Sequence, residues 1–380
     1  MDGADQYSSS SAAVGLCLLP WELLVQEILL RLSLPDLLRL RSVSRPLSSL
    51  LSSDSFRRLY HLRHSSASSH GWVFVFKKRP PRDAVLRGFH GAASRWFRIP
   101  VAPLLLPPAV PPGEDLFLLA ASGPFFLFAS NGLRALLAVD LSSRSLRRLP
   151  PSPLGPRGTS SWRRSSLHLS SDLGPAHTPL RFRFLFAELV HHRPFLFEYR
   201  SDADAWRSFE AAPAPAPAAR DAADVYLHVA QSGPESLVLR AGPDPVVYRP
   251  RFPPGEDPRA GDRMHVHGNG HVAVIRSAAA EEGAGGRARA RVVTGVELWG
   301  MAPRGGGGGG ECAWEMTSRV PREGIEEIRK PYGVMMGCLA ERDGVVRLVL
   351  LSNCKGSWDS GVALLRPRPL AVGPPAGLRH

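Results

Sequence analysis

The chain begins with a stretch of helical hydrophobic periodicity that does not recur later in the sequence. Residues 21–32 (WELLVQEILLRL) place Leu24, Ile28 and Leu32 four positions apart on one face. Pro20 suits the first turn of a helix, where its missing N–H costs nothing. This pattern predicts an amphipathic helix at the front of the chain.

Further short helices are predicted directly after the first one. Ser33 suits a helix N-cap, and Asp36 stands three positions on as the acid of a capping box. Pro46 would break a helix in its middle, so it predicts the start of a third helix. A fourth amphipathic segment begins at Ser55 and ends near His64. The pattern therefore predicts a small all-α unit of three to four helices.

This small unit, residues 19–64, carries more apolar surface than so few residues can bury among themselves. Leaving that surface in water is unfavourable by roughly 25 cal/mol per Å². Either a second polypeptide covers it, or it packs on the following part of the chain. Composition does not separate the two. The polar residues 1–18 are predicted to be a disordered lead.

The order of residues in 19–56 resembles the F-box, in the form found in plants. The matching elements are Leu19-Pro20, Ile28-Leu29, Arg31-Leu32, Leu37-Leu38-Arg39, Ser42-Val43-Ser44-Arg45 and Ser55-Phe56. The sequence departs from the family where Ser42 replaces the usual cysteine and Leu47 the usual tryptophan. The second departure removes a large aromatic contribution to packing or to partner binding.

The resemblance implies docking on the Skp adaptor and, through it, on the cullin scaffold of a ubiquitin ligase. The matching positions expected to bind the adaptor are Leu19, Pro20, Leu24, Ile28, Leu29, Leu37 and Val43. A few buried anchors usually dominate such interfaces. The alternative is a non-ligase scaffold protein whose F-box-like segment packs internally.

From Gly71 onward the hydrophobic pattern changes to short apolar runs bounded by turn residues. Examples of the runs are WVFVF (72–76) and FFLFAS (125–130). Segments such as ASNG (129–132) and ERDG (341–344) indicate hairpin turns. Many short strands with regular turns predict an all-β domain built as a sandwich, a barrel or a propeller.

Internal repetition favours the propeller. Three pairs of apolar or aromatic residues stand seven positions apart, separated by mostly small and polar residues: Phe89 and Trp96, Val139 and Leu146, and Tyr199 and Trp206. Each unit is predicted to be a strand, a tight turn and a second strand. The starts of the units are 50 and 60 positions apart, near the kelch period of roughly 50 residues. The expected propeller core residues are Trp96, Leu146, Trp206 and Trp314.

Residues 71–370 therefore resemble a degenerate kelch-type β-propeller, and an F-box followed by such repeats is typical of the plant F-box/kelch family. Dividing about 300 residues by a period of about 50 predicts about six blades. Proline-rich or low-complexity composition predicts disordered insertions in the propeller. They lie near residues 101–115, 211–223, 277–291 and 303–311.

The charge of the chain, +13, does not by itself indicate nucleic-acid binding. Only four of its 47 basic residues are lysine, and the arginines are scattered singly or in pairs rather than clustered. No apolar run reaches the roughly 18 residues that a membrane-spanning helix needs. The acidic, polar start lacks the basic residues of a secretory signal, so we expect an intracellular protein of the nucleus or cytoplasm.

Catalytic chemistry is not indicated by the motifs. His265, His267 and His271 could form a metal site, but an exposed glycine-flanked turn explains them as well. The glycine run at 305–310 lacks the Gly-Lys-Ser/Thr of a phosphate loop, and no G-x-S-x-G turn occurs. The four cysteines form no C-x-x-C pair. We expect a non-catalytic substrate receptor without cofactor or metal, which holds a target protein for ubiquitination.

Overall fold

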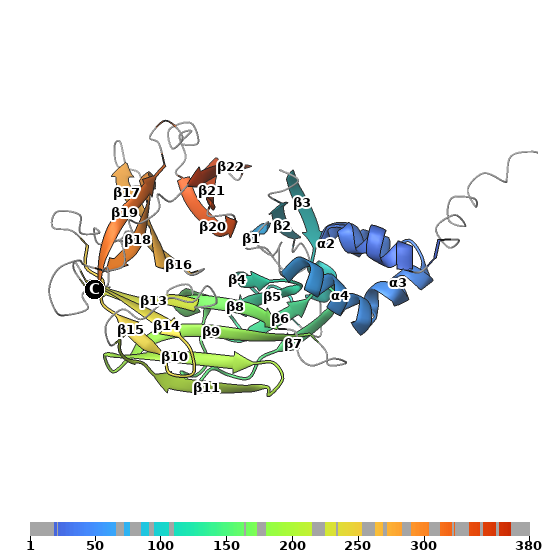
Figure 1. The fold of residues 1–380 in the computed structure, drawn as a ribbon, viewed down its shortest axis with the longest axis horizontal. Coiled ribbons are helices and arrows are strands. Elements are labelled where there is room, and N and C mark those ends of the chain that lie inside the picture. The colour runs from blue at the N-terminus through green and yellow to red at the C-terminus, as the bar shows by residue number, and fades with distance from the viewer. Residues whose placement is uncertain are drawn as a thin grey trace, which may run out of the picture.

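A computed structural model shows a group of short helices followed by a mostly β region (Figure 1). The predicted change from helices to strands is thereby confirmed. The expected lead over residues 1–18 lies outside the described residues. The structure describes residues 19–20, 22–65, 72–76, 85–90, 95–105, 110–162, 165–172, 180–214, 225–232, 235–252, 263–268, 272–282, 290–303, 312–320, 323, 334–342, 345–354 and 357–365.

The helical segment, residues 19–65, contains the short helices expected from its periodicity. They are a π-helix η1 (Leu23–Ile28), a 3₁₀ turn η2 (Leu29–Arg31), α2 (Leu34–Leu40), α3 (Arg45–Ser52) and α4 (Asp54–Ser65). Ser33 precedes α2 in an extended conformation, as predicted for an N-cap, but its hydroxyl bonds the Asp36 carboxylate instead of a backbone N–H. Ser44 caps α3 by accepting the N–H of Leu47 at 3.3 Å, and Pro46 follows in the first turn.

The helical segment has a small hydrophobic core of its own. Its buried members come from every helix of the segment: Val25, Leu29, Leu30, Leu37, Leu51 and Phe56. Two side chains of α4 form hydrogen bonds with backbone carbonyls at the end of the first helical stretch. The Tyr60 hydroxyl donates to the Leu32 carbonyl at 3.1 Å, and the His64 ring bonds the Leu30 carbonyl at 3.0 Å.

The β region consists of six sheets within the described residues, four with four strands and two with three. All neighbouring strands run antiparallel except β12 and β15, which are parallel. The strands of the first three sheets are β1 (Trp72–Phe76), β2 (Val85–His90), β3 (Arg95–Pro100), β4 (Leu116–Ser122), β5 (Phe125–Ser130), β6 (Leu136–Asp140), β7 (Ser145–Arg148), β8 (Ser166–Asp172), β9 (Arg181–Val190), β10 (Arg193–Arg200) and β11 (Ala205–Glu210).

The remaining three sheets follow in chain order. Their strands are β12 (Ala212–Pro213), β13 (Val225–Ser232), β14 (Glu235–Ala241), β15 (Val246–Tyr248), β16 (Arg263–Gly268), β17 (Val272–Glu282), β18 (Ala290–Pro303), β19 (Cys312–Arg319), β20 (Val334–Arg342), β21 (Val345–Cys354) and β22 (Ser357–Leu365). Two short helical turns, η5 (Ala102–Leu104) and α5 (Thr159–Trp162), lie in connections between sheets. The hairpins predicted around 129–132 and 341–344 are confirmed by antiparallel pairing of β5 with β6 and of β20 with β21.

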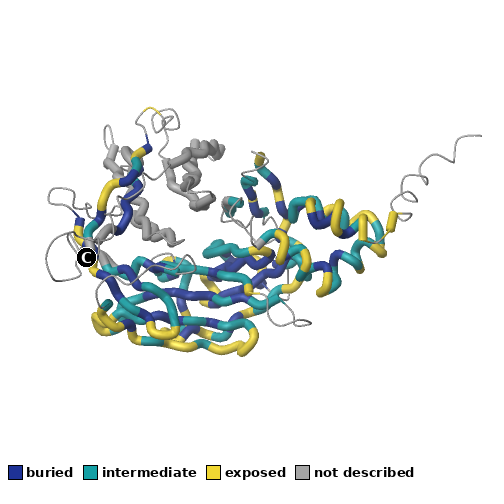
Figure 2. Tube along the Cα trace, in the orientation of Figure 1, coloured by how far each residue is buried: buried dark blue, intermediate teal, exposed yellow. Residues whose placement is uncertain are grey.

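Successive sheets pack face to face, with a hydrophobic core between each neighbouring pair for which side chains are described. Strand β5 shows the arrangement, because all six of its residues are buried (Figure 2). Phe125 and Leu127 face the sheet β8–β11, whereas Phe126 and Phe128 face the sheet β1–β3. The unbroken apolar runs of the sequence are therefore strands that bury both of their faces.

The order of contacts between sheets follows the order of the chain. An edge strand of one sheet contacts an edge strand of the next for β1 with β4, β4 with β8, β8 with β13 and β13 with β16. The last sheet also meets the first, because β20 contacts β1 as well as β18.

The three repeat units seen in the sequence are hairpins in which the paired residues lie directly opposite each other. The strand register pairs Phe89 with Trp96, Val139 with Leu146, and Tyr199 with Trp206. The ring centroids of the two aromatic pairs are 5.4 and 5.3 Å apart. A separation of seven thus returns both side chains to one face of the sheet, and the predicted strand–turn–strand units are confirmed.

The four expected core residues of the β region differ in burial. Trp314 is fully buried, stacked on Phe252 in the core between sheets β12–β15 and β16–β19. Trp206 is half-buried against the aromatic core of its sheet, and its indole N–H donates to the Pro150 carbonyl at 3.0 Å. Leu146 is also half-buried against a core, and Trp96 is half-buried beside Phe89.

Two segments predicted to be disordered are ordered where the structure describes them. In the proline-rich segment 101–115, Val101, Leu105 and Val110 are fully buried in the core below β1–β3. In the segment 277–291, residues 277–282 continue β17 and pair with β18. The prediction was wrong because it rested on proline and alanine content. In the first segment, apolar residues between the prolines are buried in a core. In the second, the alanines pair with a neighbouring strand through backbone hydrogen bonds.

The other two predicted insertions are described only at their edges. Ala212–Pro213 form strand β12, and residues 215–223 lie outside the described residues. Pro303 ends β18, and residues 304–311 are likewise outside them.

Replacing Trp314 by alanine should lower the free energy of unfolding by about 3–5 kcal/mol, because a fully buried indole leaves a cavity. The same change at half-buried Trp96 should cost clearly less. Urea unfolding of both variants, followed by far-ultraviolet circular dichroism, measures the difference. An equal loss at the two positions would contradict the packing described here.

Candidate functional site

Large hydrophobic side chains that face solvent gather on the helical segment. Among the described residues, six of the eight such side chains belong to it: Leu19, Leu23, Ile28, Val43, Leu59 and Leu62. The other two, Leu154 and Met316, lie far apart in the β region. Single exposed hydrophobic residues are ordinary, but such a concentration on one short segment marks a candidate protein interface. These six residues are called the exposed helical hydrophobics below.

The residues expected to bind an adaptor fall into two groups. Leu19, Pro20, Ile28 and Val43 are exposed, and Val43 is 67% exposed. Leu24 is half-buried, whereas Leu29 and Leu37 are only 1% and 5% exposed in the helical core. Leu29 and Leu37 therefore pack in the core under the exposed positions and are not accessible to a partner.

Sequence reasoning missed Leu23, Leu59 and Leu62, which are 49%, 44% and 51% exposed. The spacing of three between Leu59 and Leu62 places them on one face of α4 and could have identified that pair. Hydrophobic periodicity alone does not reveal which apolar stripe of a short helix faces inward.

Part of the apolar surface of the helical segment is covered by the chain itself. Leu34 and Leu38 of α2 pack against the core that contains Leu86 and Ile99 of the first sheet. The segment is thus attached to the β region along one side while its exposed helical hydrophobics remain open to solvent.

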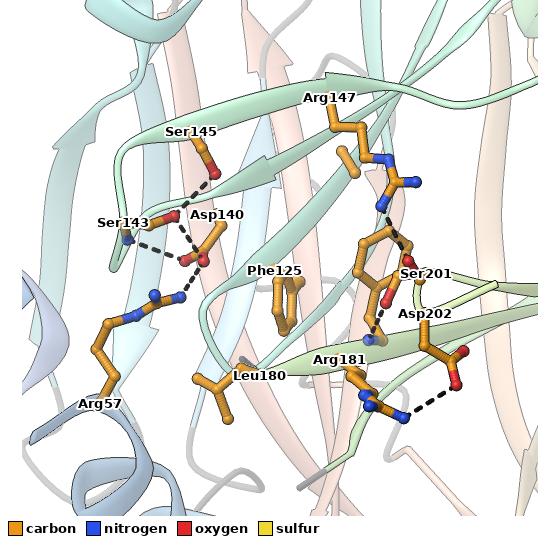
Figure 3. Close-up of a pocket in the computed structure, with 12 residues that line it drawn as sticks. Arg57, Phe125, Asp140, Ser143, Ser145, Arg147, Leu180, Arg181, Ser201 and Asp202 are labelled. Carbon is orange, nitrogen blue, oxygen red and sulfur yellow. Dashed lines mark hydrogen bonds and ion pairs between the residues drawn. The ribbon is translucent and has the colours of Figure 1, made fainter. Parts of the chain in front are cut away.

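A buried ion pair joins the helical segment to the second sheet. The Arg57 side chain of α4 pairs with Asp140 at the end of β6, and each side chain is only 10% exposed (Figure 3). The Arg57 Nε–H also donates to the Ser142 hydroxyl oxygen at 2.8 Å, and its Nη1 donates to Asp54 at 3.1 Å. A second arginine, Arg41, donates to the Ser142 carbonyl.

Asp140 is also held by the turn that follows it. Its Oδ1 accepts the Ser142 N–H at 2.8 Å and the Ser142 hydroxyl at 2.6 Å, and its Oδ2 accepts the Ser143 hydroxyl at 2.7 Å. A buried ion pair is stable only when its remaining hydrogen-bonding capacity is satisfied, and these bonds provide that. The Arg57–Asp140 pair therefore fixes the orientation of the helical segment on the β region.

A buried histidine makes a second contact between α4 and the sheets. His61 is 6% exposed, and its ring bonds the backbone of Ser171 on β8. Burial lowers the pKa of His61, against a smaller opposite effect of Asp172. Burial also lowers the pKa of His64, whose ring bonds the Leu30 carbonyl. Burial therefore favours the neutral form of both rings.

A cleft of about 500 Å³ lies beside the Arg57–Asp140 pair, between α4 and the turns of the second and third sheets (Figure 3). It is lined by Arg57, Phe125, Ala138, Asp140, Ser143, Ser145, Arg147, Leu180, Arg181, Phe182, Ser201 and Asp202. Its size falls in the range of small-ligand sites, roughly 300–1,000 Å³.

The described residues contain no group of three His, Cys, Asp or Glu side chains placed to hold a metal ion. His265 and His267 stand in β16, opposite Ile275 and Ala273 of β17, and His271 lies outside the described residues. Among the described helices, none is long and apolar enough to cross a membrane.

Replacing Asp140 by asparagine should lower the free energy of unfolding by about 3 kcal/mol, because the buried Arg57 cation loses its buried partner. The matched control is Asp54→Asn, which removes an exposed carboxylate from the same arginine and should cost about 1 kcal/mol or less. Urea unfolding measures both. Equal losses would show that the pair is no stronger than a surface contact.

Stability should fall as the pH drops below the ordinary histidine pKa of 6.5. The folded-state pKa of His61 and His64 is lowered, so the unfolded chain takes up protons first and is favoured. This contribution is complete above the unfolded pKa and is lost as the pH falls through the folded one. Unfolding free energies at about pH 7.5 and about pH 5.5 test this, around the unperturbed histidine value. His61→Gln should reduce the difference, and a pH-independent wild type would contradict the prediction.

Comparisons with known proteins identify no family for the chain. No protein-family model matches it, and no curated protein matches it. Similar solved structures include the Aleuria aurantia lectin, described as a fucose-recognising six-bladed β-propeller, at 12% identity and a TM-score of 0.36, over 82% of this chain and 95% of that one. A mutant of that lectin with alpha-methyl-L-fucoside matches at 12% identity and 0.36, over 78% and 92%. The NanB sialidase of Streptococcus pneumoniae matches at 13% identity and 0.30, over 77% and 42%.

Proposed function

We propose that the six sheets form a closed propeller of the kelch type. Three features support this: five of the six sheets are short antiparallel meanders, successive sheets with described side chains share a hydrophobic core, and the last sheet contacts the first. Radial packing of this kind leaves only short strand edges exposed. The three hairpins with directly paired residues seven apart are the repeated element of the blades.

We propose that the chain is the substrate-recognition subunit of a Skp–cullin–F-box ubiquitin ligase, acting in the nucleus or cytoplasm. The observation that carries this proposal is the concentration of exposed large hydrophobic side chains on the segment whose residue order resembles the F-box. Leu19, Ile28 and Val43 are both exposed and matched to that pattern. The Skp adaptor would cover them, and the apolar area removed from water would drive the association.

In this proposal the chain performs no bond chemistry itself. The helical segment binds the ligase core, and the β region holds a target protein. The Arg57–Asp140 pair keeps the two in one orientation, so a bound target stays near the ubiquitin-charged enzyme. The gain is one of effective concentration and orientation of target lysines.

A second candidate function is a non-ligase scaffold in which the F-box-like segment serves only to pack on the β region. The contacts between the segment and the sheets favour this candidate, because they already attach one side of the segment to the β region. These contacts are made by Leu34, Leu38, Arg57 and His61. This candidate leaves the exposed helical hydrophobics without a role.

The double variant Leu23→Asp/Ile28→Asp should reduce co-purification with a Skp adaptor at least tenfold, because charges at an apolar interface must be desolvated. A tenfold loss corresponds to about 1.4 kcal/mol of binding free energy. Both side chains are exposed, so the fold should be unchanged. The matched control is Leu154→Asp, an equally exposed leucine in the β region.

Co-expression with the adaptor and affinity purification of the complex measure the effect, with circular dichroism as the check on folding. Adaptor recovery that is the same for the double variant and the wild type, or absent for both, would favour the scaffold instead.

A further inference from the structure

The cleft beside the Arg57–Asp140 pair combines an apolar floor with two polar sides (Figure 3). The floor is made by Phe125, Ala138, Leu180 and Phe182, and the rings of Phe125 and Phe182 lie 5.1 Å apart. Phe125 comes from β5, Ala138 from β6 and Phe182 from β9, and Leu180 directly precedes β9, so the floor lies between the second and third sheets. An apolar group that entered the cleft would continue the core between those sheets.

The first polar side of the cleft is the turn between β6 and β7. Asp140 stands there with the hydroxyls of Ser143 and Ser145, whose oxygens are 2.8 Å apart. The Asp140 carboxylate is already bonded to Arg57 and to the serines of its own turn. Ser145 is exposed, so its hydroxyl is the group of this side that a ligand can reach.

The second polar side is formed by the start of β9 and the turn between β10 and β11. Arg181 donates one N–H to Asp202 at 3.0 Å, and its side chain is one-third exposed. Arg147 donates to the Ser201 carbonyl at 3.0 Å and reaches Asp204 at 2.7 Å. The hydrogen bond from Arg200 lowers the pKa of Asp202, so this side carries a carboxylate as well as two guanidinium groups.

The charges that line the cleft restrict the class of ligand that it can bind. The lining contains three arginines and two aspartates, a net charge of +1, and every one of them is already in an ion pair inside the protein. A phosphate or another compact anion would have to displace these carboxylates. A ligand with both donors and acceptors can leave the ion pairs in place, because the Arg181–Asp202 pair uses only part of the hydrogen-bonding capacity of each group. The Ser145 hydroxyl can both donate and accept.

An extended peptide has this combination of groups. Each of its residues carries one N–H donor and one carbonyl acceptor. One large apolar side chain would supply the group for the floor, and a single anchor of this type in a pocket often dominates a peptide interface.

We propose that this cleft binds a linear peptide segment of a partner protein, with one aromatic or leucine side chain on the Phe125–Phe182 floor and uncharged neighbours along the polar sides. The proposal deepens the proposed function, since the peptide would belong to the target that the ligase recognises. Arg57 lines the cleft, so a bound target would lie next to the helical segment that binds the adaptor.

The test selects peptides from a displayed library of random linear peptides against the full chain. The affinity of one synthesised, enriched peptide is then measured by fluorescence anisotropy. Ser145→Trp places a large side chain at the mouth of the cleft and should weaken binding at least tenfold. Ser208→Trp, at another exposed serine in β11 that does not line the cleft, is the matched control and should bind as the wild type does.

Two further measurements make the test independent of a single variant. Asp202→Asn removes an exposed acceptor charge without changing shape and should weaken binding about threefold or more. Alanine at the aromatic or leucine position of the peptide should weaken it at least tenfold. Failure of the library to yield an enriched peptide overturns the proposal, as does a selected peptide that binds Ser145→Trp and the wild type equally.

Adaptor co-purification of Ser145→Trp is measured alongside, because it depends on the exposed helical hydrophobics and should be unchanged. Loss of peptide binding with the adaptor retained supports the cleft. Peptide binding at the cleft without any adaptor binding would refute the ligase and leave the cleft standing. The two proposals can therefore fail separately.

Discussion

Burial of both faces of inner strands such as β5, β6 and β9 is the constraint on which the rest of the structure depends. Phe126 and Phe128 of β5 point to one neighbouring sheet while Phe125 and Leu127 point to the other. Leu185 and Ala187 of β9 face the fourth sheet, and Phe184 and Phe186 face the second. A sheet of this kind cannot stand at the end of a stack without exposing a whole apolar face. That requirement supports the ring of six sheets that we propose.

The helical segment depends on this stack, because its own core is small. Six buried side chains hold its helices together, and α2 adds Leu34 and Leu38 to the core of the first sheet. The Arg57–Asp140 pair and His61 then tie α4 to the second and third sheets. Hydrophobic contacts are non-directional and do not by themselves fix the position of the segment. A buried ion pair with all its hydrogen bonds formed requires one relative geometry of its two elements. The position of any partner on the exposed helical hydrophobics is thereby fixed relative to the β region.

The candidate interface and the cleft both include residues of α4. The exposed helical hydrophobics are 36–67% exposed, and the cleft is lined by Arg57 from the helices together with residues from two sheets. A protein that brings two others together needs two surfaces held at a constant distance. Helix α4 provides this connection, because it contributes Leu59 and Leu62 to one surface and Arg57 to the other.

The sequence by itself determined the local structure of this protein. The starts of the helices at Ser33 and Pro46 and the hairpins at 129–132 and 341–344 follow from capping, proline and turn chemistry, which act over a few residues. The cross-strand pairs Phe89–Trp96 and Tyr199–Trp206 follow from a spacing of seven across a tight turn.

Only the tertiary structure decided which apolar positions face inward. The resemblance to the F-box marked Leu29 and Val43 alike as adaptor-binding positions, but Leu29 is buried in the helical core and Val43 is exposed. Proline content suggested disorder around Val101 and Val110, but the first sheet leaves a space that their side chains fill. Arg57 and Asp140 stand 83 positions apart and carry no local signal of their pairing. Burial and ion pairing over such distances depend on how whole elements pack, and that packing is a property of the complete chain rather than of any short stretch of it.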